Sequence, residues 1–300
     1  MRDVSFKSTT LRVARARALL TVSPATVDII RRAEVPKGNP LEVAKVAAVI
    51  AAKKTTEWIP YCHNIPIEHV TVEFELTDTL ITVDVAVTSV AKTGVEMEAL
   101  TAATAAVLNL YDMLKMLDEE MEISSIRLID KKGGKSDLAV VQGWRGAVLT
   151  ASDRASAGTY EDISGNILED GLLLHGATEV LRSIVADDVE PIRDQTRHWI
   201  NEGVDIVVVT GGTGIGPRDV TPEALSPLVD KQLPGIAQAL AHYSQDRIRT
   251  AMFSRAVAGL AGQTLLLAVP GAPSACKDAL AALFPAILHV VRMVGGGQHE

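Results

Sequence analysis

A glycine-rich loop in the second half of the chain carries the clearest chemical signal. Residues 210–223 read Thr-Gly-Gly-Thr-Gly-Ile-Gly-Pro-Arg-Asp-Val-Thr-Pro-Glu and continue a short apolar run. Glycine has no Cβ atom, so Gly211, Gly212 and Gly214 let backbone N–H groups approach an anion closely. The loop is not a P-loop, because no Gly-Lys-Ser/Thr follows the glycines. We interpret it as a phosphate cradle, with a tight strand-to-helix turn as the alternative.

Charged residues within this loop suit the same chemistry. The guanidinium of Arg218 can hold phosphate oxygens, and the carboxylate of Asp219 can hold Mg²⁺ against them. A helix should begin directly afterwards, since Thr221 is a good N-cap, Pro222 fits the first helical position and Glu223 suits the first turn.

Polar residues also follow three other apolar runs of the second half, residues 147–150, 184–185 and 264–269. The polar residues are Ser152, Asp153, Asp187, Asp188 and Ser274. Ligands in parallel-sheet folds sit at the carboxyl ends of strands, so we expect this set to share one crevice with the glycines. Taken singly, Ser274 is typical of a helix cap and the aspartate pair of a solvated turn.

Candidate residues of the first half are more scattered. A helix expected from residue 96 onward carries Asp112 and Lys115, which are three residues apart and share a face. Apolar neighbours predict that this pair is partly buried, and such a pair can exchange protons near neutral pH. The alternative is an exposed ion pair that contributes little to stability.

Three further features of the first half suit an anionic ligand. Lys37 lies in a loop rich in Pro and Gly, Lys53 ends an expected helix, and residues 131–136 form a basic turn with two glycines. Cys62 adjoins His63, but one such pair without a second at metal-ligand spacing is weak evidence for zinc. Taken alone, each feature is typical of a solvated surface or a structural loop.

The spacing of apolar residues indicates the elements that position these groups in the first half. Residues 70–76 and 81–87 alternate apolar and polar positions, which predicts an antiparallel hairpin with one buried face. The other expected elements are helices over 41–53 and 96–119 and strands over 123–129 and 138–141. Helices beside a hairpin-built antiparallel sheet make an α+β domain.

The second half has a different pattern. Residues 147–150, 206–210 and 264–269 are continuously apolar, and each precedes a turn with Gly or Ser and then a helical stretch. Strands buried on both faces and alternating with helices predict a three-layer α/β domain with a mostly parallel sheet. At 300 residues the chain exceeds the usual size of one core, so we expect domains over residues 1–142 and 146–300.

Composition argues against several classes of protein. A net charge of −8 argues against a nucleic-acid partner, because binding a phosphate backbone needs a basic surface. No stretch approaches the roughly 18 uninterrupted apolar residues of a membrane span, and the N-terminus lacks the apolar run of a signal peptide. Cys62 and Cys276 lie far apart, which favours reduced thiols over a disulfide. We therefore expect a soluble, cytoplasmic protein without a membrane partner.

Three segments of the second half resemble the MoaB/MogA family of molybdenum-cofactor biosynthesis: Thr-Ala-Ser-Asp-Arg-Ala-Ser-Ala-Gly at 150–158, the loop at 210–223, and Pro-Gly-Ala-Pro-Ser at 270–274. Family members bind molybdopterin, and active ones transfer an adenylyl group from Mg-ATP onto its phosphate. The resemblance implies that Asp187 and Asp219 serve Mg²⁺ and catalysis, with no tightly bound organic cofactor. It implies a ligand-binding set of Ser152, Asp153, Gly211, Gly212, Thr213, Gly214, Arg218 and Ser274, the last touching the pterin.

The first half resembles the MoaC family over about residues 2–140. The most specific segment is Lys-Thr-Gly-Val-Glu-Met-Glu-Ala-Leu-Thr-Ala-Ala at 92–103, joined by Ile-Pro-Tyr-Cys-His at 59–63 and Gly-Gly-Lys-Ser at 133–136. That family is cyclic pyranopterin monophosphate synthase, which rearranges a cyclised dihydro-GTP into the tricyclic pyranopterin and releases pyrophosphate. The resemblance implies a ferredoxin-like fold, acid–base work by Asp112 and Lys115, and assistance from Lys37 on a mobile loop.

The same resemblance assigns substrate contacts in the first half. The residues that would hold the triphosphate are Arg12, Lys53, His63, Lys132 and Lys135, and those that would line the pocket near the base are Glu96, Met97 and Glu98. Cys62 joins this substrate-binding set. The sequence departs from the family at Asn64, where Pro is common, and at Asp137, where Gly is common, and each change could alter a loop.

The leading hypothesis is a bifunctional enzyme of molybdenum-cofactor synthesis, with cyclic dihydro-GTP, molybdopterin and ATP as ligands. The two implied steps are not consecutive in the pathway, so direct channelling does not follow. One alternative makes the second half a non-catalytic molybdopterin-binding or scaffolding module, and another makes it a general nucleotide sensor. Family members form dimers, trimers and hexamers, so we expect a homo-oligomer with the first-half site near a subunit interface.

Overall fold

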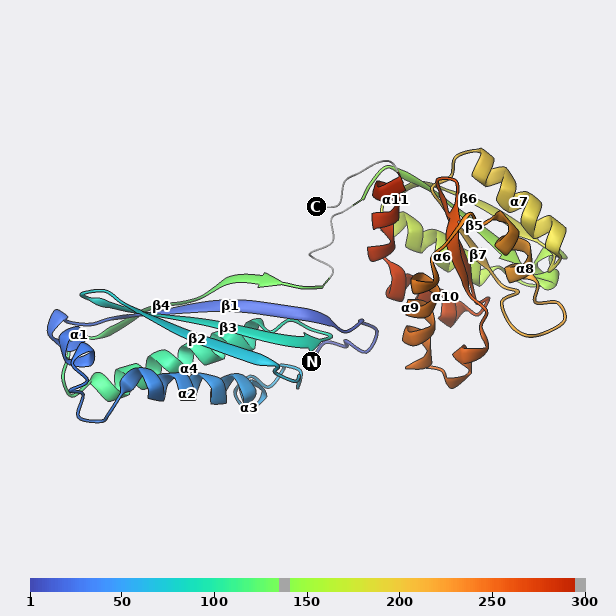
Figure 1. Ribbon diagram of the computed structural model, residues 1–300. Helices are drawn as coiled ribbons and strands as arrows, with labels where there is room; N and C mark the ends of the chain where they lie inside the picture. Colours follow the sequence, from blue (N-terminus) through green and yellow to red (C-terminus); the bar gives the residue numbers. More distant parts are fainter. Residues whose placement is uncertain (135–140, 295–300) are drawn as a thin grey trace. The chain divides into compact units, whose positions relative to one another are not determined.

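The computed structural model describes residues 1–134 and 141–294 (Figure 1). The chain divides into two compact units, Met1–Asp137 and Leu138–Glu300. Each unit has its own hydrophobic core and is described separately below.

The first unit is a four-stranded antiparallel sheet with helices on one face (Figure 1). Its strands are β1 (Thr10–Thr21), β2 (His69–Leu76), β3 (Leu80–Ala91) and β4 (Glu122–Lys132), in the order β2-β3-β1-β4. Its helices are α1 (Pro24–Arg31), α2 (Pro40–Lys53), α3 (Thr55–Trp58) and α4 (Glu96–Leu114). The succession β1-α2-β2-β3-α4-β4 is the ferredoxin-like arrangement, which confirms the predicted fold class.

Small residues let the helix layer lie close to the sheet. The inward side chains of β1 are mostly alanines, and the buried faces of α2 and α4 are also rich in alanine. The fully buried alanines of these elements include Ala14, Ala16, Ala18, Ala44, Ala48, Ala99, Ala102, Ala103 and Ala106. The helix α2 begins where expected because the side chain of Asn39 accepts hydrogen bonds from the first backbone N–H groups.

Three details of the first unit differ from the sequence-based expectations. The strand β1 was not predicted, because alanine has little strand propensity and the outward arginines resemble a surface helix as much as a strand. The helix α4 ends at Leu114 rather than at residue 119. Residues 138–140 of the expected strand lie outside the described residues, and Val141 is not part of a strand.

The second unit is a six-stranded sheet in the order β6-β5-β7-β10-β9-β8. Its strands are β5 (Trp144–Ala151), β6 (Ala177–Val185), β7 (Ile206–Thr210), β8 (Lys231–Gln232), β9 (Val257–Ala261) and β10 (Thr264–Val269). The neighbouring strands β6, β5, β7 and β10 pair in parallel. The strand β9 pairs antiparallel with β10, and β8 pairs antiparallel with β9. The mostly parallel sheet is therefore confirmed.

Helices cover both faces of this second sheet (Figure 1). One face packs against α6 (Ile163–Leu174), α9 (Pro234–Gln245) and α10 (Pro273–Leu283), and the other against α7 (Val189–Asn201) and α8 (Thr221–Leu225). Shorter helices are α5 (Asp153–Ser156), α11 (His289–Val294), η2 (Ser226–Leu228), η3 (Arg249–Phe253) and η4 (Ala286–Leu288). Two helix layers around one sheet confirm the three-layer architecture.

Two predicted helix caps are wrong. The helix α8 begins at Thr221, so Val220 holds the cap position; the Thr221 hydroxyl is buried and donates a hydrogen bond to the carbonyl oxygen of Gly211, at 2.8 Å. The helix α10 begins at Pro273 with Ala272 as its cap, so Ser274 lies inside the first turn. In both helices a proline in the first turn sets the start, and the neighbouring hydroxyl is free for other contacts.

Two other expectations concern cysteines and membrane spans. Cys62 and Cys276 are both free thiols, as predicted. Of the helices in residues 1–134 and 141–294, none alone is long and apolar enough to cross a membrane. Only the bent pair Pro273–Leu283 with Ala286–Val294 could do so, by length and composition alone.

Candidate functional site

The glycine-rich loop of the second unit is held tightly between the ends of two strands. Gly211 has a φ of +101°, and a Cβ atom there would lie 2.2 Å from the carbonyl oxygen of Ala151 at the end of β5. The Gly211 N–H donates to the carbonyl oxygen of Val269 at the end of β10, at 3.2 Å. Only glycine fits this position, because both the backbone conformation and the available space exclude a side chain.

Asp219 and Arg255 fasten the far side of the loop. One carboxylate oxygen of Asp219 accepts the Gly216 N–H at 2.7 Å, and Nε of Arg255 donates to the Gly214 carbonyl oxygen at 2.7 Å. The Arg255 guanidinium also pairs with Glu223. Sequence reasoning missed Arg255, since it follows the unrelated segment η3 and belongs to no glycine or strand-end motif. The Gly216 N–H thus holds the carboxylate of Asp219 against the glycines, and Arg255 holds the loop backbone.

A second cluster of charges lies beside the loop. Asp153 and Asp187 cap each other: each backbone N–H donates to the other's carboxylate at 3.0 Å. Arg218 donates two hydrogen bonds to Asp153, at 2.8 and 3.1 Å, and one to Asp188 at 2.8 Å. These hydrogen bonds lower the pKa of Asp153 and raise the pKa of Arg218. The Arg218 guanidinium thus binds carboxylates here, whereas the sequence analysis expected it to hold phosphate.

Asp187 carries an unfavourable charge. Burial raises its pKa, and the negative charges of Asp153 and Asp219 raise it further. A cation near Asp187 and Asp219 would relieve this repulsion, and carboxylate oxygens are the ligands that Mg²⁺ prefers. Within residues 1–134 and 141–294, no group of three or more Asp, Glu, His or Cys side chains could hold a metal ion. An ion bound by these two carboxylates alone would need phosphate oxygens and water to complete its coordination.

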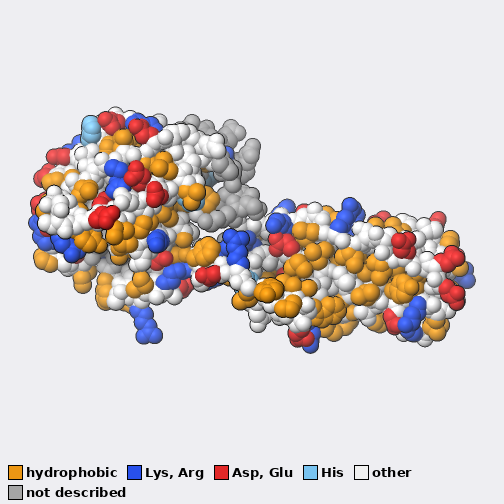
Figure 2. Space-filling model, turned by 180° about the vertical axis from the view of Figure 1, so that it is seen from behind, with side chains coloured by type: hydrophobic (Ala, Val, Ile, Leu, Met, Phe, Trp, Pro, Cys, Tyr) orange, Lys and Arg blue, Asp and Glu red, His pale blue; other side chains and the backbone are white. Residues whose placement is uncertain are grey.

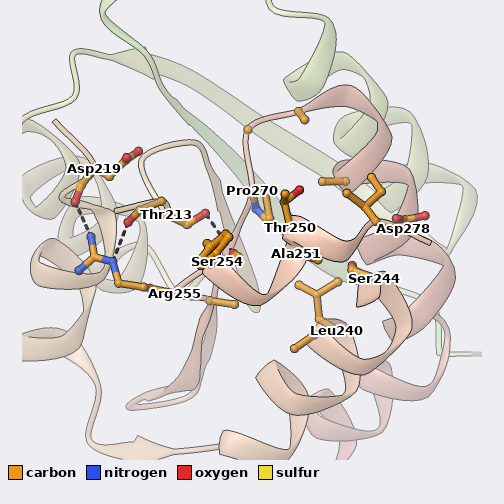
Figure 3. A pocket seen from close by; sticks show the side chains of 18 of the residues that line it. Thr213, Asp219, Leu240, Ser244, Thr250, Ala251, Ser254, Arg255, Pro270 and Asp278 are labelled. Carbon is orange, nitrogen blue, oxygen red and sulfur yellow. Dashed lines mark hydrogen bonds between the residues drawn. The ribbon is translucent and has the colours of Figure 1, made fainter. Parts of the chain in front are cut away.

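Two cavities border the glycine-rich loop. The larger, about 720 Å³, runs from the loop and Asp219 to α9, η3 and α10 (Figure 3). The smaller, about 320 Å³, is lined by residues after β5 and at the start of α6, including Ser152 and Tyr160. Gly211, Gly271 and Ala272 line both cavities. The two cavities therefore adjoin at these three residues.

The expected second-half set lies at one edge of the sheet. Lining the larger cavity are Gly211, Gly212, Thr213, Gly214, Asp219 and Ser274. Ser152 lines the smaller cavity, and its hydroxyl also accepts the Ala155 N–H at 3.3 Å. Asp153, Asp187 and Arg218 lie next to the loop and line neither cavity.

In the first unit, three expected catalytic residues meet at the end of α4. The Asp112 carboxylate lies 2.8 Å from Nζ of Lys37 and 2.7 Å from Nζ of Lys115. The hydrogen bonds from Lys115 and then Lys37 lower the pKa of Asp112 to about 2, and Asp112 in turn raises the pKa of Lys115. Asp112 and Lys115 are each 57% exposed, so the expected partial burial is wrong. The last turn of a surface helix leaves both side chains in water.

Other expected residues of the first unit gather at the start of α4. The side chain of Arg12 packs against Gly133 and Gly134, and Nζ of Lys131 lies 2.8 Å from the Glu96 carboxylate. Burial raises the pKa of Glu96, but the hydrogen bond from Lys131 and its positive charge outweigh burial, so the net pKa is lowered. The sequence analysis did not single out Lys131 among its neighbours. Lys132 is exposed at the end of β4.

The same end of α4 holds a buried acid next to a thiol. Glu98 is buried, and this raises its pKa; burial also raises the pKa of Cys62, with the charge of Glu98 adding to the effect. Nε2 of His63 lies 2.7 Å from the carbonyl oxygen of Arg2. Met97 is partly exposed, and Lys53 is exposed as the last residue of α2.

The remaining first-half candidates fall at the edge of the described chain. Lys135 and Asp137 lie outside the described residues. Asn64 is exposed in the loop that follows α3.

The group around Asp112 and the group around Glu96 do not meet within one copy of the first unit. Glu96 opens α4 and Asp112 lies in its last turn, which separates them by about 24 Å at about 1.5 Å per residue. The helix α2 runs antiparallel to α4, from the Lys37 end to Lys53, so Lys53 stays with the Glu96 group. The acid–base group and the expected triphosphate group are therefore at opposite ends of the unit.

Comparison with known families divides the chain in the same way. The sequence model of the "MoaC family" matches residues 1–134. The sequence model described as "Probable molybdopterin binding domain" matches residues 147–289. The glycine-rich loop and its neighbours lie inside the second match, and both groups of α4 lie inside the first.

Individual proteins resemble the whole chain or one half of it. A molybdenum cofactor biosynthesis bifunctional protein of Chlorobaculum tepidum is 44% identical over 100% of this chain and 96% of its own length. A cyclic pyranopterin monophosphate synthase of Aquifex aeolicus is 45% identical over 45% of this chain and 53% of its own. The solved structure of the molybdopterin biosynthesis Mog protein from Mycobacterium ulcerans is 32% identical, covers 51% of this chain and 99% of its own, and has a TM-score of 0.49.

Proposed function

We propose that this chain, which belongs to the family of bifunctional molybdenum cofactor biosynthesis proteins, catalyses two separate reactions of that pathway. The first half converts the cyclised dihydro-GTP into cyclic pyranopterin monophosphate and releases pyrophosphate. The second half binds molybdopterin and transfers an adenylyl group to its phosphate from Mg-ATP. The two reactions use separate sites, and each is argued below from its own residues.

The second reaction is supported chiefly by the glycine residues that the two cavities share. With one ligand in each cavity, both phosphate groups reach Gly211 and Gly271. A phosphate oxygen of the pterin then attacks the α-phosphorus of ATP, and the bond from that phosphorus to the bridging oxygen breaks as pyrophosphate leaves. Nucleotidyl transfer of this kind depends on positioning and charge neutralisation, which backbone N–H groups and a cation supply.

Asp187 and Asp219 would hold the Mg²⁺ that accompanies ATP. When bound, the ion neutralises charge on the transferring and leaving phosphates. The raised pKa of Asp187 fits this role, because its carboxylate lacks a positive neighbour strong enough to offset burial and two nearby aspartates. Asp219 is oriented by the Gly216 N–H and sits on the wall of the larger cavity.

A site shared by two copies of the chain would bring the Asp112 group of one copy close to the Glu96 group of the other. An exposed apolar stripe of Val43, Val46 and Ile50 runs along α2 between the two groups, and Figure 2 shows hydrophobic side chains spread over one face of this unit. In a twofold dimer packed through the stripe, with the axis perpendicular to α2, the two α2 helices run antiparallel. The Asp112 end of one copy then lies beside the Glu96 end of the other.

Lys115 acts as the proton donor in this arrangement. Asp112 raises its pKa, so the free chain presents a charged ammonium group rather than a base. Lys37 holds the other oxygen of Asp112 and keeps the carboxylate in place. A triphosphate held by the partner copy's basic residues would compete with Asp112 for both lysines. This would weaken the ion pair between Asp112 and Lys115.

A direct assay tests the second reaction. The full chain is mixed with molybdopterin and Mg-ATP, and pyrophosphate release is followed. We expect release in the wild type and in the matched surface variant Asp170→Asn, and its loss in Asp219→Asn. Tight pterin binding without ATP turnover would instead make the second half a binding module, and ATP binding without pterin binding would make it a nucleotide sensor.

A further inference from the structure

The larger cavity is lined by a carboxylate that none of the catalytic roles above uses. Asp278 of α10 lines the cavity, and its side chain is only 17% exposed. Among the described residues, no group donates a hydrogen bond to this carboxylate; the nearest cation is Nε of Arg247, 3.9 Å away. The only ion pair of Asp278 among these residues is thus a long one, and its two carboxylate oxygens stay available to accept hydrogen bonds from a ligand in the cavity.

Arg247 is oriented by another residue. Its guanidinium carbon lies 3.4 Å from the centre of the Tyr243 ring, and Nη1 donates to the Tyr243 carbonyl oxygen at 2.5 Å. The Arg247 guanidinium is therefore held near Asp278, but its Nε lies beyond hydrogen-bond distance of the carboxylate. Burial raises the pKa of Asp278 and Arg247 opposes the rise.

The cavity has two chemically different ends. Figure 3 shows Asp219 and Arg255 on one side and Asp278 on the other, beyond Thr250 and Ser244. Apolar side chains such as Leu240, Ala241 and Ile248 also line the cavity, in addition to these polar residues. This order suits an elongated ligand with a phosphate at the glycine loop, a flat ring between apolar walls, and hydrogen-bond donors at Asp278.

Ring chemistry decides which ligand fits. A 2-amino-4-oxo pterin presents the ring N3–H and the 2-amino group side by side, so that two donors face the two oxygens of one carboxylate. Adenine presents its amino donor beside a ring-nitrogen acceptor, and a carboxylate would repel that acceptor. An ionised carboxylate at this end therefore selects the pterin and rejects the adenine of ATP.

We propose that Asp278 is a specificity-determining residue that recognises the 2-amino edge of the pterin ring in the larger cavity. This inference rests on the proposal that the second half binds a phosphorylated pterin. It assigns the larger cavity to the pterin and makes Arg247 a positioning residue that acts through Asp278.

Paired probes test the assignment in the full chain. The probes are the phosphate monoester of 6-hydroxymethylpterin and its lumazine counterpart, in which an oxo acceptor replaces the 2-amino donor; binding is measured by calorimetry. We expect the wild type to bind the pterin probe tighter by about tenfold or more, as for hydrogen bonds to a charged group. Asp278→Ala loses this preference while the lumazine probe binds as before. Asp170→Ala, on the exposed surface of α6, keeps it.

A second variant gives a result that mere structural damage cannot produce. Asp278→Asn offers one acceptor and one donor, which match the N3–H and the 2-oxo group of the lumazine. We expect the preference to invert toward the lumazine probe.

The outcomes separate this inference from the proposed function. An unchanged preference in both variants, or an equal loss for both probes, overturns the role of Asp278 while pterin binding stands. A wild type that binds neither probe overturns both proposals. A wild type with the expected preference but no ATP turnover contradicts the adenylyl transfer and supports the role of Asp278.

Discussion

The two halves of this chain arrange their candidate sites in opposite ways. In the second unit, residues from the ends of β5, β6, β7 and β10 meet within a single copy around Gly211. In the first unit, Asp112 and Glu96 belong to the same helix and yet lie at its two ends. Closeness in the sequence therefore says little about closeness in a site, and the fold class decides which residues converge.

The physical reason is the direction of the strands. In a parallel sheet all carboxyl ends face one edge, so the loops that follow the strands gather there. An antiparallel sheet alternates its strand ends, and a long helix across it separates its own first and last turns by its full length. The first unit therefore separates its two groups of candidate residues along an exposed apolar stripe, whereas the second gathers its candidate residues at one edge of the sheet.

The surroundings of the candidate carboxylates also differ between the two halves. Asp112 lies between two lysines in water, and its pKa is lowered to about 2. Asp187 is partly buried beside two other aspartates, and its pKa is raised. The first carboxylate is already neutralised by its neighbours, whereas burial and the nearby aspartates oppose ionisation of the second.

The largest effect is expected at Lys115. We expect Lys115→Ala to reduce pyranopterin formation by about 10³-fold or more, because it removes a proton donor at the reacting centre. Its fold should persist, since the side chain is exposed. Pyrophosphate release from the cyclised substrate measures the reaction. The matched variant Arg197→Ala breaks another exposed pair at the same spacing, in α7, and should leave the rate unchanged. A near-normal rate in Lys115→Ala would contradict the assignment.

Gly211→Ala should damage the second half alone. The new Cβ meets the Ala151 carbonyl oxygen in a backbone conformation that alanine avoids, so we expect a loss of about 2–4 kcal/mol in the stability of the second unit. Adenylylation should fall with it. Gly203→Ala is the control, because Gly203 also has a positive φ but open space around it; it should cost about 1 kcal/mol. Equal losses in the two variants would argue against a tightly packed cradle.

Mixing variants tests whether two copies of the chain share the first-half site while the second-half site lies within one copy. Lys115→Ala and Lys132→Ala each disable one end of the first unit. Co-expressed, they should recover about a quarter of the wild-type rate, since half of randomly formed pairs are hybrids and each hybrid has one intact site. Asp187→Asn mixed with Asp219→Asn should recover no adenylylation, because both residues act within one copy. Recovery in the second case and none in the first would reverse the comparison.

The smallest effect is a difference in pH dependence. The pKa of Asp112 lies below its ordinary value of 3.8, so its ion pairs stabilise the fold above about pH 4 and lose this effect as the pH falls toward 2. The pKa of Asp187 is raised, so its charge costs stability at neutral pH and the cost disappears on acidification. In urea unfolding, Asp112→Asn should be less stable than the wild type at pH 7, with the gap narrowing toward pH 3.

Asp187→Asn should show the opposite sign. It should be as stable as the wild type or more stable at pH 7, and any gain should vanish at low pH. A gap for Asp112→Asn that widens on acidification would show that its lysine contacts do not persist in solution.

Much of the fold followed from the sequence because the signals were local. Continuous apolar runs identified β7 and β10, and alternation identified β2 and β3. The sequence pattern did not predict the strand β1, because its inward residues are alanines, which pack well only against the equally small residues of α4. Helix starts at Thr221 and Pro273 were misplaced because hydroxyl groups that could cap made tertiary contacts or pointed into a cavity.

The sequence by itself determined the two fold classes, the family of each half and the chemical types of the site residues. Those depend on composition and spacing along the chain. Only the tertiary structure decided that Arg218 binds carboxylates, that Arg255 fastens the loop, that Asp112 is exposed and that Asp278 faces a cavity. Burial, partners and distance between remote segments set these properties, and no local pattern contains them.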